Sequence, residues 1–174
     1  MNEMNNVNNI ILIRINSINA ATVARNIIYA NVTEVENARD IEANANQMLN
    51  NVISNRTLTI AEAMRTWHRG MDAAISAENL ALSLLINPTA VEINAIMDIK
   101  NNTVNNITTV RDNIIRLQND NVATARQNVD DANQRLRDAN DALIVRLADA
   151  NREWLAAINA ATSIENAALT ALNI

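Results

Sequence analysis

Apolar residues recur at spacings of three and four along almost the whole chain, which is the period of one face of an α-helix. In the first third the predicted apolar stripe comprises Ile11, Ile15, Ile18, Thr22, Ile28, Val32, Val35, Ala38, Ala45, Leu49 and Val52. The stripe predicts a helix over about 7–52. We expect this helix to end in the asparagine-rich stretch that follows, because amide side chains compete with the backbone for hydrogen bonds.

Two capping boxes predict the starts of the next two helices. In Thr59-Ile-Ala-Glu62 and in Thr89-Ala-Val-Glu92, a threonine and a glutamate three residues apart can each accept a hydrogen bond from the other's backbone amide. The first box predicts a helix over 60–86, which ends at Asn87-Pro88 because proline disfavours helical geometry in the residue before it. The second box predicts a helix over 89–118.

The last third of the chain carries a heptad-like seam in which alanine recurs. The predicted inward positions are Val110, Ile114, Leu117, Asn121, Ala125, Val129, Ala132, Leu136, Ala139, Leu143, Leu147, Ala150, Trp154, Ile158, Ala161, Ile164, Ala168 and Leu172. Small residues let helix axes approach closely, so we expect Ala132, Ala139, Ala150, Ala161 and Ala168 to be packing positions. Asn119-Asp-Asn121 predicts a weak break before a fourth helix over 121–172; without that break the third and fourth helices would be continuous.

The scarcity of turn residues fixes the fold class. The chain has one glycine, Gly70, and one proline, Pro88, whereas a sandwich or α/β fold needs frequent turn residues. The sequence therefore predicts an all-α fold: a single helical domain over 1–174, built as an elongated bundle of long antiparallel helices or a coiled coil with alanine-rich seams. Gly70 lies inside a predicted helix and indicates either a close helix contact or a mild kink.

Short sequence echoes recur along the chain. Asp-Ala-Asn occurs at 131–133, 138–140 and 149–151, and Ile-Asn-Ala-Ala-Thr occurs at 18–22 and 158–162. An internal duplication would produce such echoes. A restricted set of residue types with one helical period would produce them too, and we favour that second explanation.

Asparagine is the most abundant residue, with 32 copies against a single lysine. Many asparagines lie seven residues apart, a spacing that aligns them on one helix face. An amide both donates and accepts hydrogen bonds, and it brings no like-charge repulsion when identical faces meet. The predicted assembly positions are Asn133, Asn140, Asn151, Asn159, Asn166 and Asn173. These amides either form buried networks between helices or subunits, or they make a neutral, solvated surface.

Composition excludes several kinds of chemistry. The net charge is −5 with no basic block, which disfavours nucleic-acid binding. There is no cysteine and one histidine, His68, which we expect to be an ordinary surface or interface residue, and a single glycine cannot build a phosphate loop. We therefore predict a non-enzyme with no catalytic residue, metal or cofactor. The N-terminal sequence does not resemble a signal peptide and no apolar run is long enough to span a bilayer, so the compartment stays open.

The segment 80–97 is the most apolar part of the chain and predicts a helical hairpin. Its tip comprises Leu84, Leu85, Ile86 and Pro88. We expect the tip to be the closed end of the bundle, covered by its own helices; the other possibility is a contact site for a membrane or a partner.

Two functional hypotheses follow from these patterns. The first is a structural protein that self-assembles with its own copies into a filament, fibre, sheath or particle coat through asparagine- and alanine-rich helix faces. The alternative is a helical-bundle effector or toxin whose hairpin 80–97 contacts a membrane or a partner.

Overall fold

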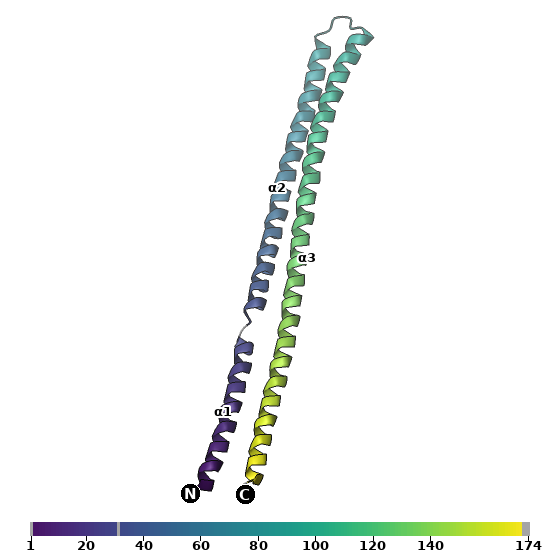
Figure 1. Cartoon of the computed structure of the whole chain (residues 1–174). Coiled ribbons are helices and arrows are strands. Elements are labelled where there is room, and N and C mark those ends of the chain that lie inside the picture. The colour runs from purple at the N-terminus through teal and green to yellow at the C-terminus, as the bar shows by residue number, and fades with distance from the viewer. Residues whose placement is uncertain (1, 31, 172–174) are drawn as a thin grey trace. The chain divides into compact units, whose positions relative to one another are not determined.

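The computed structural model describes residues 2–30 and 32–171, with side chains from residue 5 onward (Figure 1). Within these ranges the chain forms three helices and no strand: α1 (Asn2–Ala30), α2 (Thr33–Ser83) and α3 (Ala90–Ala171). The all-α prediction is therefore confirmed.

The predicted helix boundaries at 50–60 and 118–121 are wrong, because α2 and α3 run through both regions without interruption. The polar residues there bond to the helix instead of ending it. The hydroxyls of Ser54 and Thr57 donate to the carbonyls four residues earlier, at 2.9 and 3.1 Å, and Thr124 does the same toward Asp120 at 3.0 Å. The capping box at 59–62 consequently lies inside α2. Helices over 7–52, 60–86, 89–118 and 121–172 are thus replaced by the three observed ones.

The break that does occur lies between α1 and α2, inside the helix expected over 7–52. The first turn of α2 is closed by the amides of Val35 and Glu36, which both donate to the Val32 carbonyl at 2.9 and 3.1 Å. Glu34 and Glu36 place negative charge in this first turn, where the helix dipole favours it. The apolar stripe continues on both sides of the break, and for this reason the pattern alone did not reveal it.

The turn between α2 and α3 follows the predicted chemistry. Asn87 has a φ of 57°, a left-handed conformation that asparagine tolerates better than most residues, and Pro88 follows it. The capping box of α3 is formed. The Thr89 amide and hydroxyl donate to Glu92 Oε2 at 2.9 and 2.8 Å, and the Glu92 amide donates back to Thr89 Oγ1 at 3.3 Å. The start of α3 is therefore confirmed within one residue.

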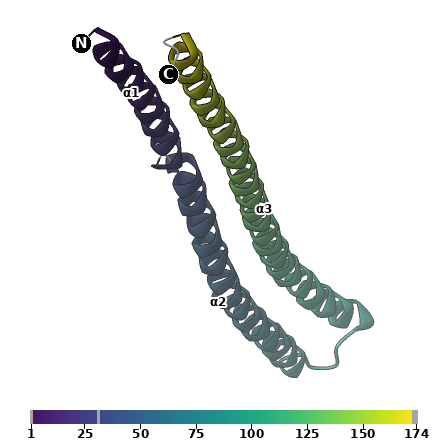
Figure 2. The same ribbon diagram turned by 90° about the horizontal axis from the view of Figure 1, so that it is seen from below.

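The chain divides into two compact units. The first unit comprises Met1–Glu42 and Ala132–Ile174, and the second comprises Ala43–Asp131. In the first unit, α1 and the first turns of α2 pack on the C-terminal half of α3 (Figure 2). In the second unit, the rest of α2 packs on the N-terminal half of α3.

The core of each unit is made of small side chains. The buried apolar residues are Val35, Ala38, Ala132, Ala150 and Ala161 in the first unit and Ala63, Ala74, Val122 and Ala125 in the second. Among the described residues no large side chain is fully buried. Of the other alanines expected at the seam, Ala139 and Ala168 are half-buried. Each unit is thus held by a thin seam between closely spaced helices.

The register of this seam differs from the prediction in the first half of α3. Val110, Leu117 and Asn121 are exposed, and their neighbours Arg111, Gln118 and Val122 face inward instead. Arg111 is held there by an aromatic partner on α2, described below. Gly70 makes the close helix contact that was one of its two expected roles: a Cβ added to it would lie 2.9 Å from Ile107 Cδ1.

Candidate functional site

Helix α1 turns its charged side chains toward α3. Arg14 Nε lies 3.0 Å from Glu165 Oε2, and the Arg25 guanidinium lies 4.3 Å from the centre of the Trp154 ring. Both arginines are half-buried, and they are the only charged side chains of α1 that the structure describes. Their apolar stems can pack against α3 while their charged groups find a carboxylate and an aromatic face.

The opposite side of α1 is consequently apolar and uncovered. Asn9, Ile13, Asn16, Ala20, Val23, Ile27 and Ala30 are spaced alternately by four and three residues, and all are exposed. We call these seven residues the outer seam of α1. Ile13, Val23 and Ile27 retain 58%, 58% and 61% of their accessible surface. A helix face with this spacing normally packs against another helix. The predicted inward positions Ile11 and Ile15 are also exposed, because Arg14 occupies the inward face.

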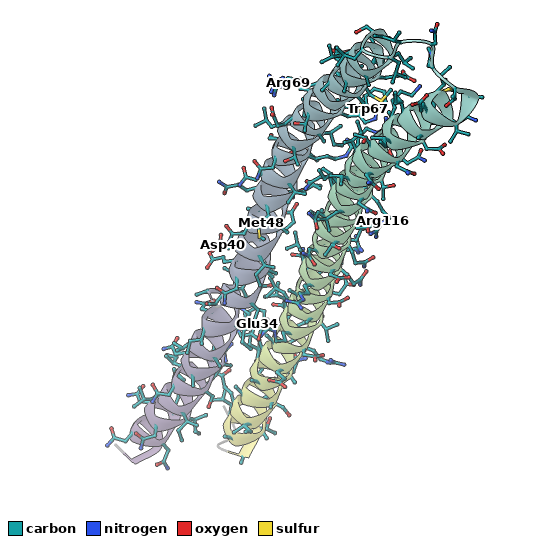
Figure 3. All side chains as sticks on the ribbon, turned by 90° about the horizontal axis from the view of Figure 1, so that it is seen from above. Glu34, Asp40, Met48, Trp67, Arg69 and Arg116 are labelled. Carbon is teal, nitrogen blue, oxygen red and sulfur yellow. The ribbon has the colours of Figure 1, made fainter. Side chains whose placement is uncertain are left out.

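The second unit carries an open apolar groove between α2 and α3, with a volume of about 570 Å³. Its apolar walls are formed by Leu58, Ala63, Trp67, Ile107, Val110 and Ile114. Trp67 points from α2 toward α3, whereas the nearby Arg69 points away (Figure 3). Leu58 and Val110 line the mouth and are largely exposed.

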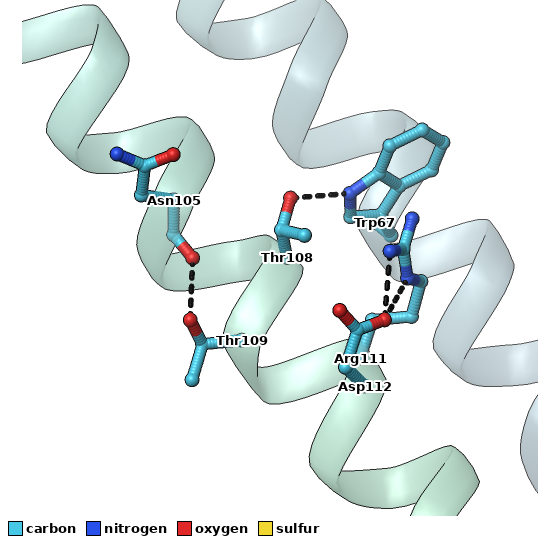
Figure 4. A network of polar contacts seen from close by, with 6 residues as sticks. All are labelled: Trp67, Asn105, Thr108, Thr109, Arg111 and Asp112. Carbon is cyan, nitrogen blue, oxygen red and sulfur yellow. Dashed lines mark hydrogen bonds and ion pairs between the residues drawn. The ribbon is translucent and has the colours of Figure 1, made fainter.

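A polar network holds Trp67 at the edge of this groove (Figure 4). Trp67 Nε1 donates to Thr108 Oγ1 at 3.0 Å, and the Arg111 guanidinium lies 4.5 Å from the centre of the Trp67 ring. Arg111 also pairs with Asp112 at 2.7 Å. Residues of α3 therefore contact both the indole N–H of Trp67, through a hydrogen bond, and the face of its ring, through a cation–π contact. Sequence reasoning missed Thr108 and Arg111 because neither residue belongs to an apolar stripe.

The asparagines lie almost entirely on the outside of each unit. Asn46, Asn133, Asn140 and Asn151 are half-buried, and every other asparagine whose side chain is described is exposed, including Asn159 and Asn166. Asn151 Nδ2 donates to the Tyr29 hydroxyl at 2.7 Å. The predicted assembly residue Asn173 lies outside the described residues. The amide stripes therefore face outward in the single chain, next to a seam that the chain's own alanines already fill.

The tip between α2 and α3 is not covered by its own helices, so the expectation of a closed end is wrong. Ile86 and Leu84 keep 91% and 73% of their accessible surface. Pro88 is also exposed, and only Leu85 is half-buried. Asn87, with a φ of 57°, and Pro88 hold the backbone of the turn away from helical geometry.

His68 is exposed and meets the neighbouring Trp67 ring edge to face, with 4.8 Å between ring centres. In the part of the chain that the structure describes, no group of three or more histidine, aspartate and glutamate side chains is placed to hold a metal ion. The described helices include none with the length and apolarity needed to cross a membrane.

No family model matches this chain, and searches of curated proteins and of solved structures find no significant match. The surfaces described above are therefore the evidence for what the protein does.

Proposed function

We propose that this chain is a non-enzymatic structural protein that self-assembles, with antiparallel, coiled-coil-like helix pairs whose outer faces bind further copies. The observation that carries the proposal is the orientation of α1. Its arginines face α3, and Ile13, Val23 and Ile27 face solvent.

The thin core supports this proposal. One pair of helices buries a single stripe of each helix, and here that stripe is filled with alanine and valine. Covering an exposed isoleucine contributes about 1.5–3 kcal/mol, so an assembly that covers the outer seam gains stability that the single chain lacks.

The chemistry of the outer seam favours identical copies as partners. It carries no charge, so two such faces meet without like-charge repulsion. Asn9 and Asn16 interrupt the apolar residues at seam positions, where an amide pairs well with another amide and specifies register. The seam also lacks the lysine and arginine residues that would favour an anionic membrane surface.

The test is imaging and sedimentation of the purified full chain. We expect regular, large assemblies by negative-stain electron microscopy, and we expect Ile13→Glu with Ile27→Glu to disperse them by placing carboxylates in the seam. The matched control is Asn8→Glu with Asn26→Glu, two exposed positions of α1 outside the seam. A wild-type chain that sediments as a monomer or dimer at high concentration would overturn the proposal.

The exposure of the hairpin tip supports a second candidate, an effector that contacts a membrane through Leu84 and Ile86. This candidate predicts flotation with liposomes that is lost in Leu84→Asp or Ile86→Asp. Asn87→Asp introduces the same charge at an already polar position and serves as the control. Liposome binding that is unchanged in the two apolar-site variants excludes the tip as the contact.

A further inference from the structure

The two units contain the same constellation of contacts. In the second unit, Trp67 donates to Thr108 and packs under Arg111, at 3.0 and 4.5 Å. In the first unit, Trp154 donates to Thr22 and packs under Arg25, at 3.0 and 4.3 Å. In both cases the threonine and the arginine lie three residues apart on one helix and the tryptophan lies on the other.

The ion pairs repeat in the same way. Arg14 pairs with Glu165 at 3.0 Å in the first unit, and Lys100 pairs with Glu78 at 3.1 Å in the second. Each tryptophan is also preceded by an arginine that pairs with an acidic residue three positions earlier, in the pairs Arg65–Glu62 and Arg152–Asp149.

These equivalent residues are separated by 86 or 87 positions in the sequence. Residues 7–30 correspond to 93–116 with an offset of 86, and residues 61–84 correspond to 148–171 with an offset of 87. Ala-x-Arg-x-Trp occurs at 63–67 and 150–154, and Ser-x-Glu-Asn-x-Ala-Leu occurs at 76–82 and 163–169. The offset changes by one residue where α1 and α2 are interrupted and α3 is continuous.

The buried residues described by the structure recur at the offset of 87. Eight of the nine form four pairs 87 residues apart: Val35 with Val122, Ala38 with Ala125, Ala63 with Ala150, and Ala74 with Ala161. The ninth, Ala132, corresponds to the half-buried Ala45. A restricted alphabet cannot by itself align packing, hydrogen bonds and ion pairs in one register. These matches therefore indicate a duplication. The shorter echoes noted in the sequence recur at offsets of 7, 11 and 140 residues, so composition remains sufficient to explain them.

The first repeat contains residues 7–30 and 61–84, and the second repeat contains residues 93–116 and 148–171. Each repeat therefore holds two complementary segments, and those of the second repeat cannot meet because they lie on one helix. We call 7–30 and 93–116 the arginine segments, and 61–84 and 148–171 the tryptophan segments. In the second repeat, Thr108 and Trp154 lie on the continuous helix α3, about 69 Å apart along its axis at 1.5 Å per residue. Each unit accordingly combines the arginine segment of one repeat with the tryptophan segment of the other.

We propose that the chain is a tandem duplication whose two interfaces are interchangeable, so that the arginine segment of one copy binds the tryptophan segment of the same repeat in a second copy. The inference rests on the proposed self-assembly and specifies one contact through which it occurs. Exchange replaces each tryptophan contact and each interhelical ion pair by a contact of the same kind between copies, which makes it a low-cost route to association. The layer of Gly70 and Ile107 is the exception, because exchange places Ala21 opposite Gly70 and Ile107 opposite Ala157. The covalent link favours pairing within one chain, so exchange increases with concentration and when copies fold together.

The close contact at Gly70 provides a sharp test, because the chain has no cysteine of its own. A Cβ on residue 70 would lie 3.8 Å from Ile107 Cβ, which is the usual Cβ separation in a disulfide. The residue of the first repeat that corresponds to Ile107 is Ala21, which lies in the other unit. A disulfide between positions 21 and 70 of two different chains therefore reports exchange between first repeats.

The experiment uses four full-length variants and two mixtures. Gly70→Cys with Ile107→Cys in one chain is expected to close an intramolecular disulfide. Ala21→Cys chains are refolded together with Gly70→Cys chains, oxidised, and analysed on a non-reducing gel. The control mixture replaces Gly70→Cys with His68→Cys, because the His68 side chain is exposed. We expect the 21/70 heterodimer at about ten times the control yield, because a facing pair orients the two sulfurs.

Equal yields from the two mixtures would overturn the exchange, and so would failure of the 70/107 disulfide to close, because the contact that defines the register would then be absent. Regular assemblies without a 21/70 heterodimer leave the proposed function standing and refute the exchange. A 21/70 heterodimer without any larger assembly supports the exchange and refutes the proposed function.

Discussion

The two arginine segments are alike on the side that faces their partner helix and different on the side that faces solvent. Toward the partner, Arg14, Thr22 and Arg25 of the first unit correspond to Lys100, Thr108 and Arg111 of the second, with equivalent contacts. Toward solvent, the outer-seam residues Ile13, Ala20, Val23, Ile27 and Ala30 correspond to Ile99, Asn106, Thr109, Asn113 and Arg116, all exposed.

This difference distinguishes the inward contacts, which the helix pair requires, from the apolar outer seam, which it does not require. The inward contacts occur in both units, so they are the ones that hold a helix pair together. Of the two arginine segments, only α1 carries a mostly apolar outer seam, and the second unit shows that a helix pair also forms with a more polar one. The apolar outer seam of α1 therefore needs an explanation other than the stability of its own unit, and contact with further copies provides one.

The largest effect expected from this comparison is at the two tryptophans. Trp67→Ala and Trp154→Ala should each lower the free energy of unfolding by about 3 kcal/mol, the lower end for such truncations, because both rings are only half-buried. Urea unfolding followed by circular dichroism measures both. If the units are equivalent, the two losses agree to within about 1 kcal/mol.

The tryptophan-to-phenylalanine variants are the matched controls. Each keeps an aromatic face for its arginine and loses one hydrogen bond, which is worth about 1 kcal/mol. A full loss at one tryptophan with almost none at the other would contradict the equivalence of the two contact sets.

Local sequence chemistry predicted the elements whose cause is local. The proline after Asn87 and the capping box at 89–92 placed the turn and the start of α3, and the lone glycine inside a helix marked a close contact. The capping box at 59–62 has the same local chemistry but is not used, because α2 packs on α3 on both sides of it and helix continuity is favoured. Local patterns therefore predict where a helix can start, and tertiary packing decides whether it does.

The candidate site was predicted less well, for a different reason. Apolar spacing predicts that apolar residues face the partner helix. In α1, however, the inward positions belong to Arg14 and Arg25. Their partners Glu165 and Trp154 are more than a hundred residues away in sequence, so no window of the chain contains the pair. The repeat of Ala-x-Arg-x-Trp at an offset of 87 is visible in the sequence and indicates that Trp67 and Trp154 are equivalent positions. The sequence does not show which residues these tryptophans contact.

A second prediction concerns the pH dependence of the stability of the second unit, which contains Glu92. The backbone amide and hydroxyl of Thr89 donate to Glu92 and lower the pKa of its carboxyl below the ordinary value of 4.5. A lowered pKa in the folded state means that the stabilisation is present above pH 4.5 and is lost as the pH falls through the folded-state pKa. Asn6 stands at the corresponding position of the first unit, so that unit lacks this acid-sensitive cap.

Glu92→Gln should therefore reduce the loss of stability between pH 6 and pH 3, measured as the change in urea midpoint. Glu62→Gln is the control for removing one exposed carboxylate from a similar Thr-x-x-Glu sequence that caps no helix. It also removes the exposed ion pair with Arg65, which contributes little to stability. A pH dependence that is the same in wild type and in Glu92→Gln would show that the cap does not contribute to it.

The smallest effect is expected at Gly70, where the two units differ in the core itself. The first unit has Ala157 at the corresponding position and Ala21 in place of Ile107, so there a methyl group replaces the glycine and a smaller residue faces it. In the second unit, a methyl group on residue 70 would meet Ile107 Cδ1 at 2.9 Å and Cγ2 at 3.4 Å. Alanine gains about 1 kcal/mol in helix propensity over glycine, and moving the end of Ile107 out of its rotamer costs about 0.5–1.5 kcal/mol. The two effects nearly cancel, so Gly70→Ala should change the free energy of unfolding by less than about 1 kcal/mol in either direction.

Gly70→Ala with Ile107→Val, which removes the clashing Cδ1 atom, should be more stable than Ile107→Val alone. If Gly70→Ala is no better tolerated with valine than with isoleucine at position 107, the glycine is required for a reason other than this contact.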